Sequence, residues 1–546
     1  MERALFLKFL IRSKFNFKRA YEYYKTYDKI LKLGLFDKAF YLKNYPNVEK
    51  SGMDPLEHFL FYGCEEGKYP GPFFNIHSYM EENPKIKINP LVHYVLENSK
   101  GHIFTNSPVK TVKERLIQTN SLFLHNYTFK EEPLVSIIVL NRNGSKHLKR
   151  LFKDFDVKAH YNHYEIIVVD NDSSDDSIDV LKGLSKILPI TIIENKENVS
   201  FSKGNNDAAK IANGDYLLLL NNDIEPTYGW LNEMMGTMLS NKNVGAVGAK
   251  LVFPYEYNRK HKVKSFSIQH AGVKFHEANN PYVYSPYHEN MFFNQIFDKK
   301  VNETKECISN TAAALLIPKK IYFELDGLDE DYFYGYEDID FAFKLFINNY
   351  KSIYCASAML FHHESATRLK DEKAEKINFK NIMRFKNKWN DVLFKNFLKN
   401  KIKHEKFFTN KKLAITIFSE DYNTEYISNL SKNFLEMDYE YKILSDLTNY
   451  NLQSETDILL SFSSEYNVKK IVARLNLIKI LFLENLENLE YIDKYDIILT
   501  FNEEIANKLK NEYLHENVFI INKLNSDSYK NNSKEIIDII EKVYLE

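Results

Sequence analysis

The chain has 546 residues, of which 44% are hydrophobic and 27% charged, so it can bury several cores and is expected to be globular. Its length predicts three or four domains. Lys and Arg total 73 and Asp and Glu total 74, which argues against a dedicated nucleic-acid-binding protein, since such proteins carry a basic surplus. The three cysteines, Cys64, Cys307 and Cys355, lack the short spacings that would predict a disulfide framework or a zinc site.

Residues 1–32 are predicted to form a basic amphipathic helix. Apolar residues recur there at helical spacing among Lys and Arg: Leu5, Phe6, Phe9 and Leu10. The segment lacks the cleavage site of a secretory signal, and no run of about 18 apolar residues occurs in the chain, so a cytoplasmic protein is expected. Basic amphipathic helices lie either on a protein surface or on a membrane surface. Peripheral attachment to the inner face of the cytoplasmic membrane therefore stays open, both here and for residues 379–408.

A degenerate repeat follows this helix. FDKAFYLKNYP from Phe36 is answered by FFNIHSYMEENP from Phe73, and DPLEHFLFYG from Asp54 is answered by NPLVHYVLENSKG from Asn89. A period of about 35 to 38 residues is typical of stacked supersecondary units. Because two units are too few for a solenoid, we expect a small helical domain over residues 33–104, followed by a linker over residues 105–132.

Four short apolar runs predict the buried parallel strands of an α/β sheet. They are LVSIIVL (134–140), YEIIVVD (164–170), ITIIEN (190–195) and DYLLLLN (215–221). In such sheets ligands bind at the carboxyl ends of the strands. Polar residues stand at three of these ends: Asn141–Asn143, Asp170–Asp172 and Asn221–Asp223. We therefore expect a binding site at this edge of the sheet.

A second alternation of strands and helices begins at about Lys412. Its apolar runs are KLAITIF, ETDILLSF, IKILFLEN, YDIILTF and NVFIIN. Residues 412–546 are therefore predicted to form one small Rossmann-like domain, joined by a linker over residues 395–411. The segment lacks a G-x-G-x-x-G motif, so a dinucleotide-binding role has no support.

Three further groups of side chains are candidates for chemistry. Asp223 ends an apolar strand, where a carboxylate either binds a cation or caps a turn. Glu337 and Asp338 begin an apolar helix, whose dipole favours acidic residues. However, six acidic residues between positions 329 and 340 would repel one another without a cation or substrate nearby. His362 and His363 follow the apolar run IYCASAMLF, where a histidine is either a packed side chain or a ligand.

The order and spacing of these motifs resemble glycosyltransferase family 2, most closely its rhamnosyltransferase-like members of bacterial surface-polysaccharide synthesis. The resemblance rests on VSIIVLNRN, VVDNDSSDDS, ENVSFSKGNNDAA, GDYLLLLNND, the acidic pair before a helix, and HHESATR, in this order. NVGAVGAKLVFP, IQHAGVKF and SNTAAALLIPKKIYFELDGLDE lie between them. It covers residues 133–394 and implies a GT-A fold, which is an α/β fold with a Rossmann-like nucleotide half and an acceptor half.

The resemblance assigns roles to the candidate residues. Asp338 would be the catalytic base and Glu337 its acidic neighbour. Asp223 and His362 would bind a divalent metal, Mn²⁺ or Mg²⁺, with His363 as the alternative to His362. The family's D-x-D element is NND here, so metal coordination would fall chiefly on its last residue.

The resemblance also implies contacts to both substrates. The implied donor contacts are Val139, Asn141, Asp170, Asn171, Phe201, Gly204, Asn205, Asn206, Asn221 and Asn222. Asp170 would contact the base or the ribose, and residues 201–206 would belong to a loop that covers the donor. The turn formed by Gly327, Leu328 and Asp329 would lie on the acceptor side.

The implied function is an inverting glycosyltransferase that moves a sugar from a nucleoside-diphosphate sugar to a hydroxyl of a glycan or lipid-linked acceptor. An inactive GT-A-like scaffold or carbohydrate-binding protein is the alternative. A nucleotidyltransferase is disfavoured because the segment after Leu140 is poor in glycine. The motifs leave dTDP-rhamnose, UDP-N-acetylglucosamine and UDP-galactose open as donors. The C-terminal domain looks like half of a GT-B glycosyltransferase, and we expect it to serve docking or oligomerisation.

Overall fold

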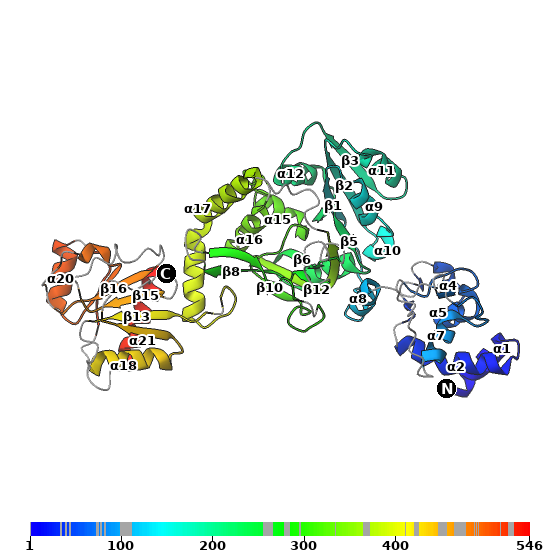
Figure 1. Cartoon of the computed structure of the whole chain (residues 1–546), viewed down its shortest axis with the longest axis horizontal. Coiled ribbons are helices and arrows are strands. Elements are labelled where there is room, and N and C mark those ends of the chain that lie inside the picture. The colour runs from blue at the N-terminus through cyan, green and yellow to red at the C-terminus, as the bar shows by residue number, and fades with distance from the viewer. Residues whose placement is uncertain are drawn as a thin grey trace.

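The structure is a computed structural model of the whole chain. It describes residues 2–32, 35–38, 41–42, 45–71, 76, 79–80, 83–98, 112–254, 266–277, 284–293, 296–333, 335–363, 372–409, 411–419, 425–445, 456–463, 477–484, 486, 489, 491–513, 515–521 and 529–545. Figure 1 shows three parts, which are a group of N-terminal helices, a central sheet with its helices, and a C-terminal sheet. None of the described helices is long and apolar enough to cross a membrane.

The first 32 residues form two helices instead of the single predicted helix. They are α1 (Glu2–Arg12) and α2 (Phe17–Lys32). The chain turns between them because Lys14 and Phe15 adopt positive φ angles of 54° and 61°. The Asn16 carboxamide oxygen then accepts a hydrogen bond from the Arg19 N–H at 3.0 Å, which caps the start of α2.

In both repeat units a buried tyrosine pairs with a half-buried histidine. The Tyr41 hydroxyl lies 2.9 Å from His58 Nδ1, and the Tyr79 hydroxyl lies 2.7 Å from His93 Nδ1. The helical elements here are α4 (Pro46–Lys50), α5 (Pro55–His58), the π-helical turn η1 (Phe59–Gly63) and α7 (Pro90–Asn98). Residues 72–75, 77–78 and 81–82 of the second unit lie outside the described residues. Each unit thus contains one tyrosine–histidine hydrogen bond at the equivalent position, which gives a structural reason for the sequence repeat.

The central sheet has the order β10-β12-β6-β11-β4-β1-β2-β3, with β5 on β12 and β7 on β6. Its parallel half contains the four predicted strands, β1 (Val135–Asn141), β2 (Tyr164–Asn171), β3 (Ile190–Asn195) and β4 (Tyr216–Asn221). The other strands are β5 (Ile224–Pro226), β6 (Val244–Val252), β7 (Ile268–His270), β10 (Lys305–Cys307), β11 (Ala314–Pro318) and β12 (Lys351–His362). A separate hairpin joins β8 (Val273–Glu277) and β9 (Tyr284–His288).

The direction of the strands divides this sheet into two halves. β11 runs antiparallel to both β4 and β6, while β12 runs parallel to β6. A parallel Rossmann-like half is therefore joined to a mixed half. This mixed sheet confirms the GT-A fold class expected from the sequence resemblance.

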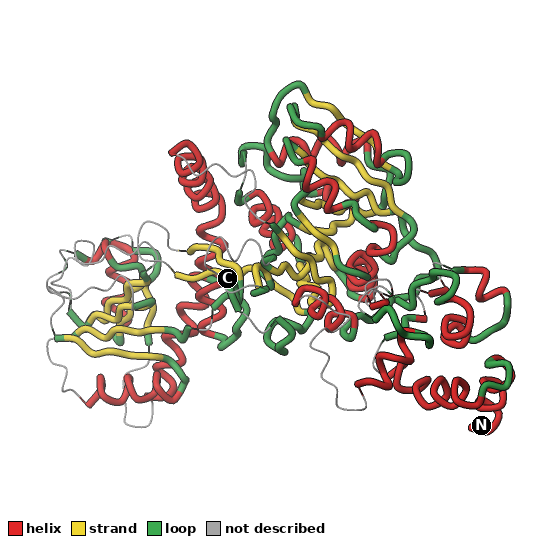
Figure 2. The backbone as a smooth tube through the Cα atoms, turned by 45° about the vertical axis from the view of Figure 1, so that its right-hand side comes forward, coloured by secondary structure: helices red, strands yellow, loops and turns green. Residues whose placement is uncertain are grey.

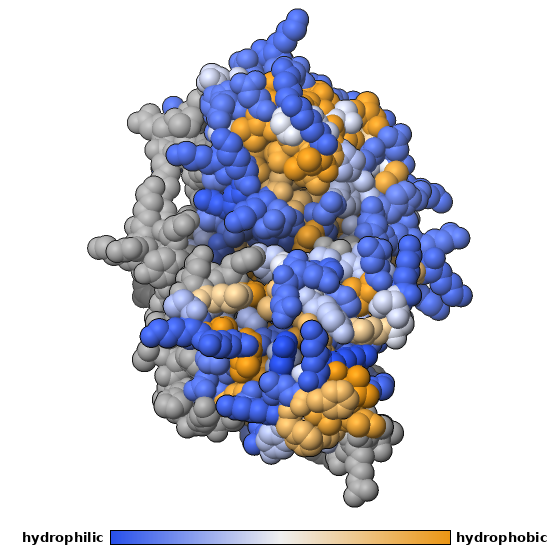
Figure 3. Space-filling view, turned by 90° about the vertical axis from the view of Figure 1, so that its right-hand side faces the viewer, coloured by the Kyte–Doolittle hydropathy of each residue, from blue (hydrophilic) through white to orange (hydrophobic). Residues whose placement is uncertain are grey.

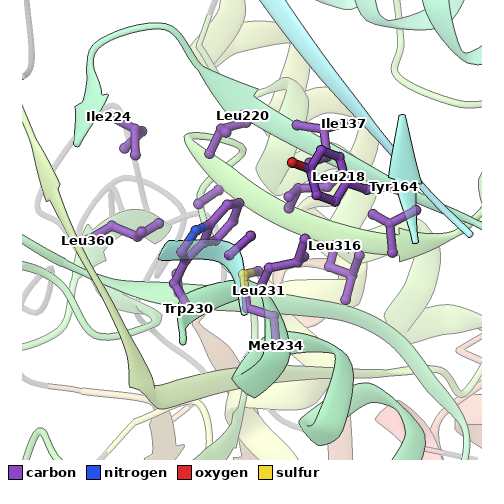
Figure 4. Packing of buried hydrophobic residues seen from close by; sticks show 14 of the residues in the cluster. Ile137, Tyr164, Leu218, Leu220, Ile224, Trp230, Leu231, Met234, Leu316 and Leu360 are labelled. Atoms are coloured by element: carbon purple, nitrogen blue, oxygen red, sulfur yellow. The ribbon is translucent and has the colours of Figure 1, made fainter. Parts of the chain in front are cut away.

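The parallel strands are nearly continuous apolar runs because both faces of the sheet are buried. Ile137 and Val139 of β1 enter one core, and Ile138 between them enters another. Figure 4 shows the first core, where Leu218 and Trp230 pack against neighbouring strands. Figure 2 shows helices flanking this sheet. They are α9 (Ser145–Leu151), α10 (Phe155–Ala159), α11 (Ser177–Leu184), α12 (Phe201–Ile211), α13 (Trp230–Ser240), α15 (Lys319–Glu324) and α16 (Glu337–Ile347).

The described part of the predicted linker 105–132 packs on the central sheet. It contains α8 (Val112–Ser121), whose Leu116 and Ile117 pack against a buried apolar cluster. The Asn120 carboxamide nitrogen donates to the Ser357 carbonyl oxygen at 3.0 Å. Residues 105–111 lie outside the described residues. The predicted linker therefore contains a helix whose Leu116 and Ile117 pack on the protein, while Leu122 after it is exposed.

The predicted linker 395–411 is likewise part of a packed helix. The helix α17 (Glu372–Ile402) contributes Trp389 and Phe397 to a cluster with the central part. Its last residues, Leu398 and Ile402, belong to the core of the C-terminal sheet. One continuous helix therefore enters two cores, and the predicted boundary at residue 395 falls inside it.

The C-terminal sheet is parallel throughout, with the order β14-β13-β15-β16-β17-β18. Its elements are β13 (Ala414–Phe418), α18 (Glu425–Glu436), β14 (Glu440–Leu444), β15 (Ile458–Ser461), β16 (Ile478–Phe482), the 3₁₀ turn η2 (Ile492–Lys494), β17 (Ile497–Thr500), α20 (Glu503–Glu512), β18 (Val518–Ile520) and α21 (Tyr529–Tyr544). β14 was not among the predicted strands, and its charged and polar alternation, EYKIL, explains why. The expected Rossmann-like α/β arrangement is confirmed.

Candidate functional site

Polar side chains from three neighbouring strands meet at the carboxyl edge of the parallel half. Asn141 of β1 lies opposite Asp170 of β2 in the strand register. The Asn141 amide nitrogen donates to Asp170 Oδ1 at 2.8 Å, and its carboxamide oxygen accepts from Asn222 Nδ2 at 2.9 Å. One asparagine thus joins the ends of β1, β2 and β4. The predicted grouping of polar strand ends follows from their parallel direction.

The Asp170 carboxylate is buried but well supplied with donors. Besides Asn141, it accepts hydrogen bonds from the Ser173 N–H at 3.0 Å and from the Ser173 hydroxyl at 2.7 Å. The turn between them is possible because Asp172 adopts a positive φ of 58°. These donors offset the cost of burying the charge. Asp170 is therefore held in a fixed orientation beside Asn141.

Asp223 and His362 face each other at the next strand end. The His362 Nε2 atom lies 3.1 Å from Asp223 Oδ1, and both side chains are nearly buried. Burial opposes ionisation of Asp223, but the facing His362, with His147 and His363 nearby, lowers the pKa of Asp223 below its usual value. On the far side of the ring, His362 Nδ1 lies 2.9 Å from Gln269 Oε1. A proton on Nδ1 would leave the Nε2 lone pair directed at the carboxylate.

The second histidine of the tandem pair points elsewhere. The His363 N–H donates to the Asp223 carbonyl oxygen at 3.0 Å, but its ring nitrogen Nε2 lies 3.3 Å from Glu225 Oε2. Glu225 also binds Lys113 Nζ at 2.6 Å. The imidazole that faces the Asp223 carboxylate is therefore that of His362, and the ring of His363 pairs with Glu225.

Asp338 is tied to the same edge through the backbone just before β11, the strand that pairs with β4. Its Oδ2 atom accepts from the Ala312 N–H at 3.1 Å, and its Oδ1 atom accepts from the Ile339 N–H at 2.9 Å. The adjacent Ala313 carbonyl accepts the Asn221 N–H at 3.0 Å. The backbone of Ala312 and Ala313 thus connects the Asp338 carboxylate to Asn221, which lies two residues before Asp223. Glu337, its neighbour, is buried at the start of α16.

The residues of the predicted donor loop mostly make contacts within the protein. Gly204 packs so closely on β1 that a Cβ atom there would lie 2.8 Å from Leu140 Cδ2. The Asn205 amide nitrogen donates back to the Phe201 carbonyl at 2.9 Å. The Phe201 N–H in turn donates to the Phe333 carbonyl at 3.1 Å. These residues fasten α12 to the sheet and to the segment before α16.

Asn206 uses its whole carboxamide to hold the predicted acceptor turn. Its oxygen accepts from the Leu328 N–H at 3.0 Å and from the Tyr322 hydroxyl at 2.5 Å. Its nitrogen donates to the Leu328 carbonyl at 2.9 Å and to Glu330 Oε1 at 3.0 Å. The turn itself needs Gly327, whose φ is 57°. The Asn206 side chain is therefore engaged with this turn and its neighbours, whereas the resemblance implied a donor contact.

Two other predicted donor contacts have side chains that are already engaged. The Asn171 carboxamide accepts from Asn195 Nδ2 at 2.8 Å and donates to the Val199 carbonyl at 3.3 Å. The Val139 side chain is fully buried in the core between sheet and helices. Only the Val139 backbone could contact a ligand, because the side chain points into the core.

The third residue of the acceptor turn is bound to α17. Asp329 accepts from Lys388 Nζ at 3.2 Å and lies 3.5 Å from Arg384 Nη2. Lys388 and the indole N–H of Trp389 also bind the buried Asp340 of α16, at 2.9 Å and 2.8 Å. The turn and the first residues of α16 are thus held by one helix.

Two residues near the candidate metal ligands were missed by the sequence analysis. Gln269 orients His362, and His147 of α9 lies near Asp223. Burial lowers the pKa of His147, against the attraction of Asp223. Neither residue carries a local signal, since each is recognised only by its partner in another part of the chain. The IQHAGVKF motif contains Gln269 and was the nearest available hint.

The donor set at Asp223 and His362 fits a divalent cation in its chemistry. One carboxylate oxygen and one imidazole nitrogen lie 3.1 Å apart, and because Mg²⁺ prefers oxygen ligands, this pair suits Mn²⁺ better than Mg²⁺. Among the described residues, no group of three or more His, Cys, Asp or Glu could hold a metal ion. Phosphate oxygens and water could supply further ligands of a cation held by Asp223 and His362.

Comparison with known proteins gives the following matches. Residues 136–304 match the model of glycosyl transferase family 2. The uncharacterized protein y4gI of Sinorhizobium fredii is 29% identical over 253 residues, which are 45% of this chain and 26% of that protein. The O-antigen biosynthesis protein RfbC of Myxococcus xanthus is 28% identical over 256 residues, which are 45% of this chain and 18% of RfbC. The matches thus span only about a quarter or less of these relatives.

A solved structure with a similar fold is that of GalNAc-T7 with UDP, GalNAc and Mn²⁺. It is 12% identical, covers 57% of this chain and 56% of its own, and has a TM-score of 0.36.

Proposed function

Because residues 136–304 form a glycosyltransferase family 2 domain, we propose that this chain transfers a sugar from a nucleoside-diphosphate sugar to a hydroxyl group of a glycan or lipid-linked acceptor. The biological setting that we propose is the synthesis of a bacterial surface polysaccharide. One observation carries the proposal. Contacts from different parts of the chain bring Asp170, Asp223, His362 and Asp338 to one edge of the central sheet.

The nucleotide would lie against Asn141 and Asp170. The buried Asp170 carboxylate accepts hydrogen bonds, so it suits an N–H of a base or the hydroxyls of a ribose. Asn222 links this pair to the strand end that carries Asp223. The base and the diphosphate would then occupy neighbouring positions along the same edge.

The diphosphate would lie at Asp223 and His362, which would together hold a divalent cation. When bound, such a cation neutralises negative charge that builds up on the departing diphosphate. Gln269 keeps the His362 ring in place by holding Nδ1. A bound cation would itself favour the ionised form of Asp223, which a metal ligand requires.

Asp338 would remove the proton from the attacking acceptor hydroxyl. Its carboxylate is half-exposed, and its two backbone hydrogen bonds fix its direction at the start of α16. A single displacement with inversion at the anomeric carbon follows, since the base and the leaving diphosphate act on opposite sides of the sugar. The turn at Gly327–Asp329 would border the acceptor.

We also propose a division of labour along the chain. The segment 133–394, extended by the packed parts of 112–132 and 395–409, would form the catalytic unit. Residues 33–104 and 412–546 would be accessory units, and residues 412–546 would serve docking or oligomerisation. A cytoplasmic location stays a prediction.

The central experiment replaces the proposed base. Asp338→Asn should lower transfer by about 10²- to 10⁴-fold, which is the usual contribution of a general base. Donor binding, measured by calorimetry, should change little. The exposed Asp179→Asn on α11 serves as a matched control and should keep wild-type turnover. Near-normal turnover of Asp338→Asn would show that another group accepts the proton.

The donor has to be identified first, by a binding screen in the presence of the proposed metal. A panel of nucleotide sugars can be screened by thermal shift with Mn²⁺ present, because a ligand raises the apparent stability of the state that it binds. Donor hydrolysis with and without Mn²⁺ then separates an enzyme from a binding protein. A donor that binds but is never turned over, with any acceptor offered, would favour the inactive scaffold.

A further inference from the structure

The outer surface of α1 and α2 exposes large apolar side chains and lysines together. The exposed apolar side chains are Leu7, Ile11, Phe15, Phe17, Tyr21 and Leu31. The exposed lysine side chains are Lys8, Lys14, Lys18, Lys25 and Lys29. Over residues 5–31, where the side chains are described, the only two acidic residues are Glu22, which is half-exposed, and Asp28, which is exposed. We call this set of exposed side chains the α1–α2 surface.

Helical spacing separates the α1–α2 surface from the side that faces the protein. Leu7 and Ile11 are four residues apart on one face of α1, while Phe9 and Leu10 are buried in the N-terminal core. On α2, Phe17 and Tyr21 are likewise four residues apart and exposed. Each helix therefore has a second apolar face that the described part of the chain leaves uncovered.

The turn between the helices presents its aromatic side chain outward. Phe15 is 73% exposed although its backbone is in the left-handed region, which residues with a Cβ atom seldom adopt. The Phe15 N–H donates to the Leu10 carbonyl at 2.9 Å, and the Lys14 N–H donates to the Ile11 carbonyl at 3.0 Å. These bonds fix the turn, so Phe15 stays in water rather than folding back onto the core.

We propose that the α1–α2 surface docks on an anionic phospholipid membrane. Residues 1–32 contain nine Lys and Arg against three Asp and Glu, whereas the whole chain is balanced. Aromatic and aliphatic side chains enter the boundary between headgroups and acyl chains, while lysines extend their ammonium groups to lipid phosphates. Figure 3 faces this end of the molecule and shows apolar side chains surrounded by hydrophilic ones on its lower part.

The charge pattern favours a lipid surface over a protein groove. An amphipathic helix that binds a protein groove usually presents a continuous apolar stripe with its charges on the other side. Here the lysines stand beside the apolar residues: Lys8 next to Leu7, Lys14 next to Phe15, and Lys18 next to Phe17. This interleaving suits a headgroup layer, where the apolar and the charged group each find a partner at a different depth.

The other basic amphipathic segment does not offer such a surface. Three large aromatic side chains of α17, Phe385, Trp389 and Phe397, are buried against the protein, whereas Phe379 near the start of the helix is 54% exposed. The membrane interpretation of residues 379–408 is therefore not supported, and the α1–α2 surface is the part of the chain to test.

Flotation of the full-length protein with vesicles tests the proposal without any need for transfer activity. The protein should float with phosphatidylcholine vesicles that contain phosphatidylglycerol, and not with phosphatidylcholine alone. Lys14→Gln with Lys18→Gln should weaken binding about 25-fold, at about fivefold per lysine, and added salt should weaken it as well. Phe15→Ser with Phe17→Ser should abolish flotation. Lys320→Gln with Phe323→Ser removes the same residue types from the exposed face of α15 and should float like the wild type.

Fluorescence gives a second and independent measurement. Both tryptophans of the chain, Trp230 and Trp389, are buried, so Phe17→Trp adds a single exposed indole. Its emission should shift to the blue, and brominated lipids should quench it, when anionic vesicles are added. A wild-type protein that stays in solution, or a Phe15/Phe17 variant that floats equally well, overturns the proposal. So does a concentration-dependent dimer, seen by light scattering, that the same variant abolishes, because a second copy would then cover the surface.

Discussion

The replacement of Asn206 by alanine distinguishes its observed position from its implied role. The wild-type carboxamide makes four hydrogen bonds to the segment 322–330, and the buried Tyr322 hydroxyl is one of its partners. A net gain of about 1 kcal/mol per bond gives an upper limit of about 4 kcal/mol. Partial exposure of this site lowers the expected loss to about 2–3 kcal/mol.

The assay for Asn206→Ala has two parts. Urea denaturation should show the loss of unfolding free energy, and calorimetry should show donor affinity within about threefold of the wild type. The loss of transfer should come mainly from weaker binding of the acceptor, because the turn at Leu328 loses its hydrogen bonds to Asn206. Asp207→Ala, one position along α12, removes only two exposed ion pairs with Lys203 and Lys210 and should cost less than about 1 kcal/mol.

One result would refute the interpretation of Asn206. If Asn206→Ala kept its stability but lost donor affinity by tenfold or more, the carboxamide would act on the donor. The hydrogen bonds to the turn would then be incidental. Asn206→Asp sharpens the comparison, because it keeps both acceptor bonds and brings a negative charge next to Glu330.

Two further predictions concern the packing of the segments that join the parts of the chain. A Cβ atom at Gly236 would lie 1.9 Å from the Tyr127 ring, so Gly236→Ala should lower the melting temperature, whereas Gly183→Ala in α11 meets nothing within 4 Å and should raise it slightly. Lys401→Met leaves the Asp457 carboxylate, now 2.7 Å from Lys401 Nζ, without its cation, and should destabilise the C-terminal sheet by about 3–5 kcal/mol in urea titrations. Unchanged unfolding of either Gly236→Ala or Lys401→Met would contradict the corresponding contact.

The strand ends were predictable because apolar runs mark the strands, and because the carboxyl ends of parallel strands lie at one edge of a sheet. Continuous apolar runs marked β1 to β4, and parallel direction placed Asn141, Asp170 and Asp223 at one edge. The resemblance added Asp338 and His362, whose roles no local pattern could assign. Their positions in the structure are compatible with those roles.

Contacts between distant segments were not predictable from the sequence. Asn206 is separated from Leu328 by 122 positions, and Gln269 from His362 by 93. The segment NNDAA alone is compatible with two roles for Asn206: contact with a ligand, or hydrogen bonds to another part of the chain. The linkers were misjudged for a related reason, since α8 is polar in composition and reveals its packed residues Leu116 and Ile117 only against the sheet.

The helix α17 limits how the chain can be shortened for experiments. A fragment that stops at residue 394 would remove Phe397 and Phe408 from the cluster that also contains Phe343 of α16, and would leave Trp389 less covered. A fragment that stops at Phe408 would instead keep this cluster whole, but it would expose Leu398 and Ile402, which normally enter the C-terminal core. A fragment that stops at Phe408 therefore requires polar replacements at Leu398 and Ile402 to stay in solution.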